Sequence, residues 1–284
     1  SGLPLVPPIL RDPEKTTTRG TGELIAAALD QGCRRLLIGI GGSATNDGGA
    51  GMARALGARF LDRSGRDLPE GGGALDQLDR IDLSGLDPRL KDASIQVASD
   101  VTAPLCGPQG ASLVFGPQKG ASPEQAARLD LCLAHYGRVL EETFHKPLAD
   151  LPGAGAAGGL GAGLMAFCGA QLRPGIDIIF ELLHLEEEAA QADLILTGEG
   201  RIDATSATGK LLSGVGKLAR LYHKPAIAFA GAVALSDAEL QAIGLQTAVP
   251  ICDSPMALED SLSRAAELTF RAAQRAGRLM ALPF

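Results

Sequence analysis

The chain has 284 residues, of which 45% are hydrophobic and 21% are charged, with 37 glycines, no tryptophan and a net charge of −7. This length suits one large or two ordinary domains, and the composition is typical of a globular α/β enzyme. The acidic balance argues against binding to nucleic acid or to an anionic membrane, because both need a basic surface. We therefore expect small-molecule partners.

The cysteines and the hydropathy pattern narrow the setting. The five cysteines are scattered and form no C-x-x-C pair, so neither a disulfide framework nor a zinc site is indicated. We recognise no signal peptide and no apolar run long enough to span a bilayer. These features predict free thiols and a cytoplasmic location.

The first predicted elements surround a polar loop. Residues 21–30 predict a helix, 34–40 a buried strand, 50–56 a second helix and 58–61 a further strand. Together they suggest a strand–loop–helix–strand unit. The polar loop, residues 41–49, lies where a buried strand feeds a helix, and backbone N–H groups at such a point bind anions.

Side chains in the polar loop add to this chemistry. Ser43, Thr45 and Asn46 supply hydrogen-bond donors. Asp47 places a carboxylate where a bare phosphate would be repelled, unless a cation or a hydroxyl proton lies between them. The loop is therefore predicted to bind a phosphorylated ligand with a metal, or a hydroxylated acid. A tight turn whose glycines only supply positive φ is the alternative.

The same unit can be compared with the dinucleotide-binding fold. Gly39-x-Gly41-x-x-Ala44 resembles its fingerprint, and Asp62 follows the next strand at about the position of a ribose-binding acid. Asp47 has no role in that scheme. An NAD-dependent oxidoreductase built on these residues is the second hypothesis.

The middle of the chain alternates between irregular and regular stretches. Residues 63–91 predict a surface excursion of loops and short elements, and 95–100 a buried strand ending in Asp100. An aspartate at the carboxyl end of an α/β strand is well placed for ligand or metal, although it can also cap its own loop. Residues 122–145 predict a long helix, 152–167 a glycine-rich loop entering a tightly packed helix, and 175–191 a further helix. His135 and His145 are interpreted as packing or surface residues on the long helix.

A second cluster of charged residues follows the strand predicted at 192–197. Its members are Glu199, Arg201, Asp203 and Lys210, in a loop that begins with Gly198 and Gly200. Carboxylates there can hold Mg²⁺ or accept a hydroxyl proton, while Arg and Lys can bind a carboxylate or a transferring phosphoryl group. The segment does not match a Walker A loop, and a surface turn with self-paired charges is the alternative. Helices and strands then alternate to the final helix at 258–280, which indicates a doubly wound parallel sheet.

These stretches resemble the bacterial glycerate kinase family. The resemblance is carried by residues 1–6, 38–49, 99–111, 115–120, 152–167, 197–203 and 209–210. It implies phosphorylation of D-glycerate by ATP, with the 2-position favoured. It also implies two α/β domains, one Rossmann- or flavodoxin-like with a mainly parallel sheet and one inserted with a mixed sheet, with glycerate and nucleotide in the cleft between them.

The resemblance also implies domain boundaries. Family members begin with a strand and an Asp-Ser-Phe-Lys-Gly-Ser-like loop that this sequence does not show. We therefore expect residues 1–192 to be the inserted domain. Residues 193–284 are then the second half of the Rossmann-like domain, whose first half is missing from the sequence. We expect a monomer or homodimer.

The two acid-bearing loops suggest a mechanism. Asp203 or Asp100 would deprotonate a glycerate hydroxyl, and Glu199 with the other aspartate would hold Mg²⁺ on ATP. Arg201 and Lys210 would bind the carboxylate or the phosphoryl group. The expected binding residues are Gly41, Gly42, Ser43, Thr45, Asn46, Asp47, Gly48, Gly198 and Gly200. A non-catalytic fragment that binds glycerate or nucleotide without turnover is the third hypothesis.

Overall fold

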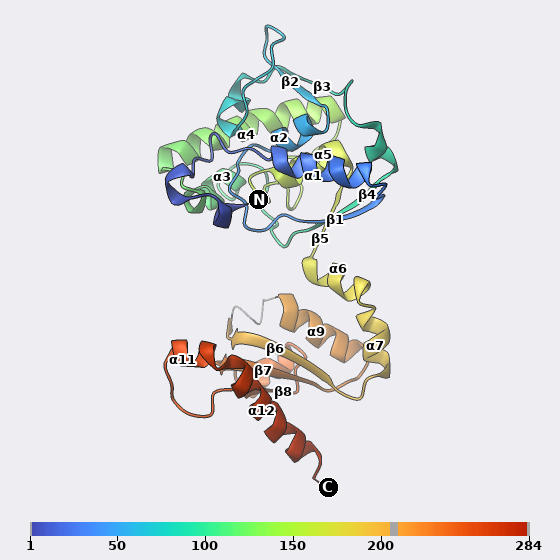
Figure 1. Ribbon diagram of the computed structural model, residues 1–284, viewed down its shortest axis with the longest axis vertical. Helices are drawn as coiled ribbons and strands as arrows, with labels where there is room; N and C mark the ends of the chain where they lie inside the picture. The colour runs from blue at the N-terminus through green and yellow to red at the C-terminus, as the bar shows by residue number, and fades with distance from the viewer. Residues whose placement is uncertain (1, 205–209, 283–284) are drawn as a thin grey trace. The chain divides into compact units, whose positions relative to one another are not determined.

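A computed structural model describes residues 2–204 and 210–282 (Figure 1). The chain forms two compact units, unit 1 (Ser1–Gly175) and unit 2 (Ile176–Phe284). The division falls 17 residues before the boundary expected at 192, counting from 175. That the units are an inserted domain and half of a Rossmann-like domain stays a prediction.

A three-stranded parallel sheet lies at one side of unit 1. It consists of β1 (Arg35–Gly39), β4 (Ser94–Ala98) and β5 (Gln171–Arg173), in the order β1-β4-β5. The strands predicted at 34–40 and 95–100 are therefore confirmed. Strand β5 was not predicted, because three residues are too few for a recognisable pattern.

Strand β2 (Arg59–Leu61) does not join this sheet. It pairs antiparallel with β3 (Arg80–Asp82) in a separate two-stranded sheet. Its position is set by packing, because Phe60 is fully buried with its ring centroid 6.3 Å from that of Tyr136 and 5.8 Å from that of Phe167. The predicted strand, loop, helix and strand are all present, but the two strands lie in different sheets. Asp62 therefore does not follow a neighbour of β1, as the dinucleotide hypothesis requires.

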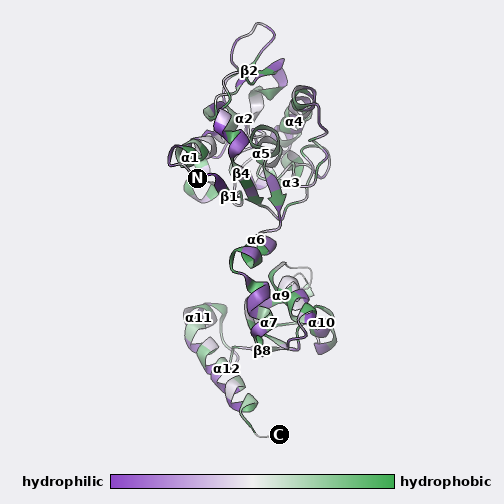
Figure 2. Ribbon diagram, turned by 90° about the vertical axis from the view of Figure 1, so that its right-hand side faces the viewer, coloured by the Kyte–Doolittle hydropathy of each residue, from purple (hydrophilic) through white to green (hydrophobic). Residues whose placement is uncertain are grey.

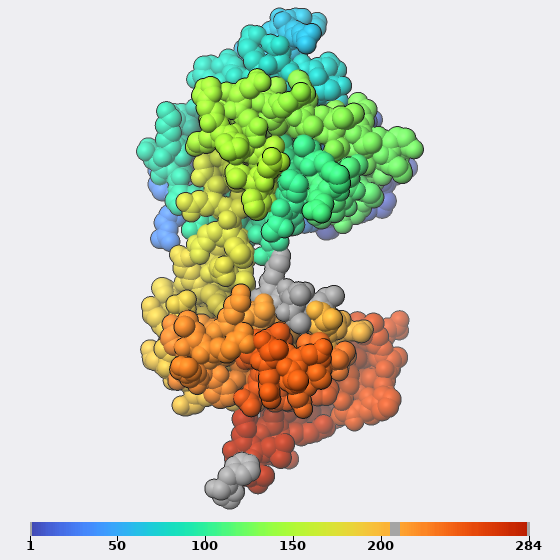
Figure 3. Space-filling model, turned by 180° about the vertical axis from the view of Figure 1, so that it is seen from behind, coloured from blue at the N-terminus to red at the C-terminus, as the bar shows by residue number. Residues whose placement is uncertain are grey.

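Helices and short turns build the core of unit 1. The bounds are α1 (Arg19–Asp30), α2 (Ala50–Ala55), α3 (Ala111–Phe115), α4 (Pro123–Phe144) and α5 (Leu160–Cys168). The long helix predicted at 122–145 is confirmed by α4, and Ser122 forms a capping box with Gln125 at its start. The residues of α4 and the segments beside it form much of the face of unit 1 seen in Figure 3.

The predictions for residues 152–167 and 63–91 agree with the structure to different extents. The predicted glycine-rich entry to a packed helix is confirmed by α5, which is almost wholly buried. The excursion contains η3 (Gly72–Gln77), β3 and η4 (Pro88–Asp92), as short elements were predicted. It is not confined to the surface, however, since Leu75 and Leu78 are buried in the main core.

Unit 2 contains a second parallel sheet. It consists of β6 (Ile195–Ile202), β7 (Ala226–Val233) and β8 (Thr247–Pro250), in the order β6-β7-β8. The helices are α6 (Gly175–Leu182), α7 (Leu185–Gln191), α9 (Lys210–Leu221), α10 (Asp237–Ala242), α11 (Leu258–Ser263) and α12 (Ala265–Met280). The single helix predicted at 175–191 is interrupted, because His184 adopts a left-handed φ of 52° between α6 and α7.

Two separate apolar clusters show that helices cover both faces of this sheet. One cluster joins β6 and β7 to α9 and α10 through residues such as Ile202, Leu212 and Leu240. The other joins Ile251, after β8, to Leu268 and Ala272 of α12. Hydrophobic and hydrophilic residues alternate along α12 in Figure 2. This two-sided covering agrees with the predicted doubly wound arrangement.

No helix in the described parts of the chain is both long enough and apolar enough to cross a membrane.

Candidate functional site

The polar loop joins β1 to α2 in unit 1 and divides into two parts. The part that reaches solvent contains the exposed Gly41 and Gly42 and the half-buried Ser43 and Thr45. The other part, Asn46, Asp47 and Gly48, is buried. Only the first part is therefore open to a ligand in this structure.

The Asp47 carboxylate is occupied by the protein itself. It accepts hydrogen bonds from the Thr18 backbone N–H at 2.8 Å, from Thr18 Oγ1 at 2.9 Å, and from the N–H groups of Gly51 and Gly49 at 3.1 and 3.2 Å. Burial raises the pKa of this carboxyl, and the hydrogen bonds from Thr18, Gly51 and Gly49 oppose the rise. The Asp47 carboxylate thus fixes the turn into α2. The sequence analysis had instead expected it to face a ligand.

Its neighbours are held in the same way. Asn46 Nδ2 donates to Ser112 Oγ at 2.9 Å, Gly48 N–H donates to the Gly158 carbonyl at 3.0 Å, and Tyr136 Oη donates to the Gly48 carbonyl at 3.0 Å. Asn46 Oδ1 is buried without a hydrogen-bond partner among the described residues. The buried part of the polar loop is therefore preorganised by side chains from distant parts of the chain.

A buried lysine also holds this loop. Lys119 ends η5 (Pro117–Lys119), is 1% exposed and donates from Nζ to the Thr45 carbonyl at 2.7 Å. Burial lowers the pKa of its ammonium to about 8, although the charge of Asp47 opposes the fall. The sequence analysis assigned no role to Lys119, although it belongs to the segment 115–120 that carries part of the family resemblance.

Asp100 lies at the same sheet edge as the polar loop. Strands β1 and β4 are parallel with Gly39 opposite Ala98, so both carboxyl ends meet there. Asp100 is exposed and accepts a hydrogen bond from the Gly175 N–H at 3.1 Å. The structure adds Arg173, which ends β5 opposite Ala98 and which the sequence prediction missed.

In unit 2, the predicted charged loop begins later than expected. Strand β6 continues to Ile202, and Glu199 and Arg201 pair with Ala230 and Ala232 of β7. Gly198 and Gly200 are therefore strand residues and not a loop, and both are exposed. The backbone at these positions is extended because its hydrogen bonds go to β7.

A cavity of about 790 Å³ lies beside the carboxyl ends of the three strands of unit 2. Crevices at the carboxyl ends of parallel strands are the usual ligand sites of α/β sheets. Its polar lining includes Thr197, Glu199, Arg201, Cys252 and Ser261, and its apolar lining includes Phe229, Ile251, Met256, Leu258 and Leu262. The sequence predicted the charged part of this lining, whereas the apolar part, from β7, the segment after β8 and α11, was missed.

The remaining predicted catalytic residues are Arg201 and Asp203, at the end of β6, and Lys210, further along the chain. Arg201 Nε and Asp203 Oδ2 form an ion pair at 3.1 Å, which orients both groups. Lys210 begins α9, and its side chain lies outside the described residues.

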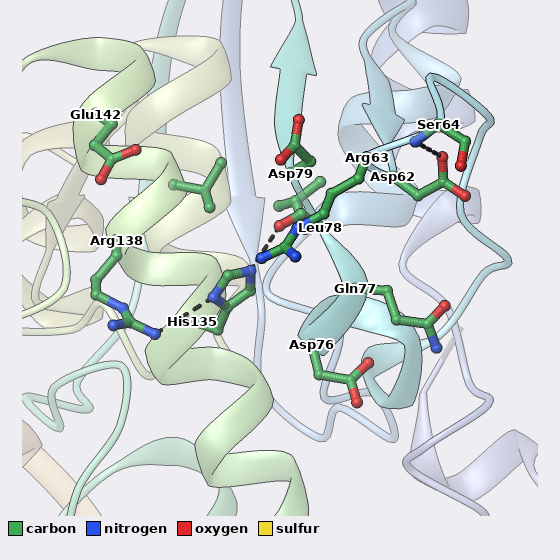
Figure 4. A pocket seen from close by; sticks show the side chains of 11 residues that line it. Asp62, Arg63, Ser64, Asp76, Gln77, Leu78, Asp79, His135, Arg138 and Glu142 are labelled. Carbon is green, nitrogen blue, oxygen red and sulfur yellow. Dashed lines mark hydrogen bonds between the residues drawn. The ribbon is translucent and has the colours of Figure 1, made fainter.

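A second cavity, of about 540 Å³, lies in unit 1 between α4 and the η3 region (Figure 4). There His135 Nε2 lies 2.6 Å from the Leu78 carbonyl, and Arg138 Nη2 lies 3.3 Å from His135 Nδ1. Since the guanidinium can only donate, Nδ1 accepts and Nε2 donates. Both ring nitrogens are thus engaged, in line with the packing role predicted for His135. Asp62, on the same cavity, is ion-paired with Arg66 at 3.0 Å.

Comparison with known proteins places the chain in a family. Residues 1–281 match the model of the "Glycerate kinase family". The chain is 49% identical to the glycerate 2-kinase of Escherichia coli strain K12 over 99% of this chain and 74% of the relative. It is also 49% identical to the glycerate kinase of Bacillus subtilis strain 168, over 96% and 72% of the two chains. The crystal structure of a proposed glycerate kinase 2 from Salmonella typhimurium LT2 is similar, with a TM-score of 0.86, 52% identity, and 99% and 74% of the two chains covered.

The chain belongs to the glycerate kinase family. The resemblance seen in the sequence is therefore confirmed, as is the α/β fold class. The named relatives are kinases, that is, phosphotransferases, for which ATP is the expected phosphoryl donor.

For this glycerate kinase family member, the predicted metal ligands do not form a preassembled cluster. Among the described residues, no three His, Cys, Asp or Glu side chains gather in a way that could hold a metal ion. Glu199 belongs to unit 2 and Asp100 to unit 1. A single exposed carboxylate still fits Mg²⁺, because this ion usually binds one or two carboxylates together with substrate phosphates and water.

Proposed function

We propose that the chain phosphorylates D-glycerate with ATP and forms 2-phosphoglycerate. The observation that carries this proposal is the family match over residues 1–281, with glycerate kinases as relatives at 49% identity. The name of the Escherichia coli relative, glycerate 2-kinase, supports the 2-position. We also propose that the protein acts in the cytoplasm as a monomer or homodimer.

The cavity of unit 2 is proposed to bind the nucleoside part of ATP. Phe229, Ile251 and Met256 give it an apolar wall, which suits a heteroaromatic base. Glycerate has only three carbons and carries oxygen on each of them, so it gains little from such a wall. The exposed Glu199 and Arg201 border the same cavity, where they could meet the polar end of the nucleotide.

The charged residues then share the work of phosphoryl transfer. Asp203 or Asp100 is proposed to take the proton from the glycerate hydroxyl. Arg201 and Lys210 are proposed to hold the carboxylate or the transferring phosphoryl group. Mg²⁺, bound by Glu199 with the other aspartate and the phosphates, would neutralise negative charge on ATP.

The polar loop of unit 1 is proposed to bind an anionic part of a substrate through its solvent-reaching residues. Ser43 and Thr45 supply hydroxyl groups there, and Gly41 and Gly42 leave the backbone accessible. Asn46, Asp47 and Gly48 contribute indirectly, by holding the loop. Because the loop is already held, it loses little conformational entropy of its own when a substrate binds.

The first experiment measures ADP release by the purified chain with ATP, MgCl₂ and D-glycerate. We expect turnover that stops when EDTA is added. Product identity follows from adding enolase alone, which consumes 2-phosphoglycerate, or enolase with phosphoglycerate mutase, which also consumes 3-phosphoglycerate. A signal that needs the mutase would refute the 2-position.

Two outcomes would refute the kinase proposal itself. Saturable binding of D-glycerate or ATP without any ADP release would favour the non-catalytic hypothesis. Reduction of NAD by the chain with a hydroxy acid, without a need for Mg²⁺, would favour the oxidoreductase hypothesis.

A further inference from the structure

Lys119 is the one charged side chain in the described core of unit 1, besides Asp47, that is almost fully buried. Its Nζ bonds to the Thr45 carbonyl, and no other acceptor for its three N–H groups is found within the described residues. A buried ammonium with one partner is costly, since it loses its hydration without full replacement. A neutral donor could hold a carbonyl at lower cost.

The buried end of the polar loop carries a second cost. Asn46 Oδ1 has no partner in the described part of the chain, although Asn46 is next to the residue that Lys119 holds. Incompletely satisfied polar groups in a packed region are expected at functional sites. Two such groups, Lys119 Nζ and Asn46 Oδ1, lie at residues 45–46 of the polar loop.

The position of Lys119 suggests a function that would explain why a charge is buried here. The Thr45 carbonyl is bound by Lys119, and the preceding carbonyl, of Ala44, accepts a hydrogen bond from Thr16 Oγ1 at 2.7 Å. Because peptide units are planar, fixing two successive carbonyls also fixes the direction of the N–H groups beside them. Ser43 and Thr45 themselves reach solvent. A buried positive charge therefore lies directly behind the open part of the loop.

We propose that Lys119 is a positioning residue for substrate binding. Through the Thr45 carbonyl it holds the open part of the polar loop, and its charge favours an anionic group there. That group is the carboxylate of glycerate or a phosphate of ATP. This inference rests on the proposed function, because it takes the polar loop to be a substrate-binding element.

The test compares Lys119→Met and Lys119→Gln with the wild-type chain. Lys91→Met serves as the matched control, since Lys91 is exposed in the same unit. We expect Lys119→Met to raise the KM of one substrate at least about tenfold while kcat changes less than about threefold. The KM that rises identifies the anion: that of D-glycerate indicates the carboxylate, and that of ATP a phosphate. Lys119→Gln keeps an amide donor without the charge and should show the same rise if the charge matters.

Several results would overturn the inference. If Lys119→Met and Lys119→Gln are folded and keep both wild-type KM values, Lys119 does not position the loop. If kcat falls in proportion to the folded fraction with both KM values unchanged, its role is only structural. If Lys119→Met does not fold, Lys119→Gln decides alone by the same criterion. A wild-type chain that releases no ADP refutes the proposed function and this inference with it, whereas an active wild type with unaffected variants refutes this inference only.

Discussion

Replacing Lys119 with methionine should stabilise unit 1 or leave its stability unchanged. The pKa of Lys119 falls from an ordinary value of 10.5 to about 8, which corresponds to about 3 kcal/mol against the charged form in the fold. Methionine has a similar volume and removes this cost. It also leaves the buried Thr45 carbonyl without its donor, which costs about 1–3 kcal/mol. The variant should therefore be about 0–2 kcal/mol more stable at pH 7.

The advantage of the variant should shrink as the pH rises. Below pH 8 the lysine is protonated in both the folded and the unfolded chain, and the fold bears the full cost. Between pH 8 and 10.5 the folded chain loses this proton while the unfolded chain keeps it, so wild-type stability rises. Between pH 7 and 9.5 the wild type should gain about 2 kcal/mol on the variant. The charge of Asp47 opposes the fall in the pKa of Lys119, so this attraction is already part of that shift, and Tyr136 of α4, which bonds to the same loop, is common to the two chains.

Urea unfolding followed by pulse labelling of Cys132 and Cys168 provides the assay, because both thiols are buried in unit 1. Midpoints for wild type and Lys119→Met would be compared at pH 7 and at pH 9.5, with Lys91→Met as the control. A loss of more than about 2 kcal/mol in Lys119→Met at pH 7 would refute the reasoning, because the ammonium would then stabilise the fold on balance. A variant that is stable but binds substrate poorly is the signature of a residue kept for function.

Other substitutions and probes test the remaining roles. Asp47→Asn should destabilise unit 1 by about 2–4 kcal/mol, since an amide places donors against backbone N–H groups; full stability with a raised KM would instead show a ligand contact. Asp203→Asn should lower kcat by at least about 100-fold if Asp203 is the base, and little loss of turnover excludes it. Glu199→Gln should raise the Mg²⁺ concentration needed for half-maximal activity, and an unchanged requirement would remove Glu199 from the metal site. ATP should slow alkylation of Cys252, which lines the cavity of unit 2, whereas D-glycerate should not; equal protection by both would refute the nucleoside assignment.

The sequence located the segments of the candidate site better than it described their local structure. It identified the strand ends that carry the polar loop and Asp100, because a buried apolar run followed by polar residues is visible within a few residues. It expected the strand to end at Thr197, before Gly198, because glycine usually weakens a strand. In the structure, a side chain at Gly231 of β7 would meet the carbonyl of Gly200, so glycines on adjacent strands allow a close approach. That partner lies about thirty residues further along the chain, and no local pattern shows it.

The same limit applies to the side chains of the polar loop. Residue type suggested that Asn46 and Asp47 bind a ligand, just as it did for Ser43 and Thr45. In the structure, Asn46 and Asp47 are buried by hydrogen-bond partners that are distant in sequence, whereas Ser43 and Thr45 reach solvent. Thr18 lies 29 residues from Asp47, and Ser112 lies 66 residues from Asn46. Such partners are chosen by the fold, so their effect on burial cannot be read from a nine-residue window.

Substitutions in the open part and in the buried part of the polar loop should therefore have different effects. Its open residues can exchange water for a ligand, and substitutions there should change substrate binding with little effect on stability. Its buried residues have given their hydrogen bonds to the protein, so substitutions there should act first on stability and only then on binding. Lys119 stands apart from both groups, because it is buried and its charge is expected to cost stability. A fold that keeps such a charge gains nothing from it in packing, which is why its removal, more than that of any open loop residue, distinguishes a loop shaped for an anion from a turn that is merely tight.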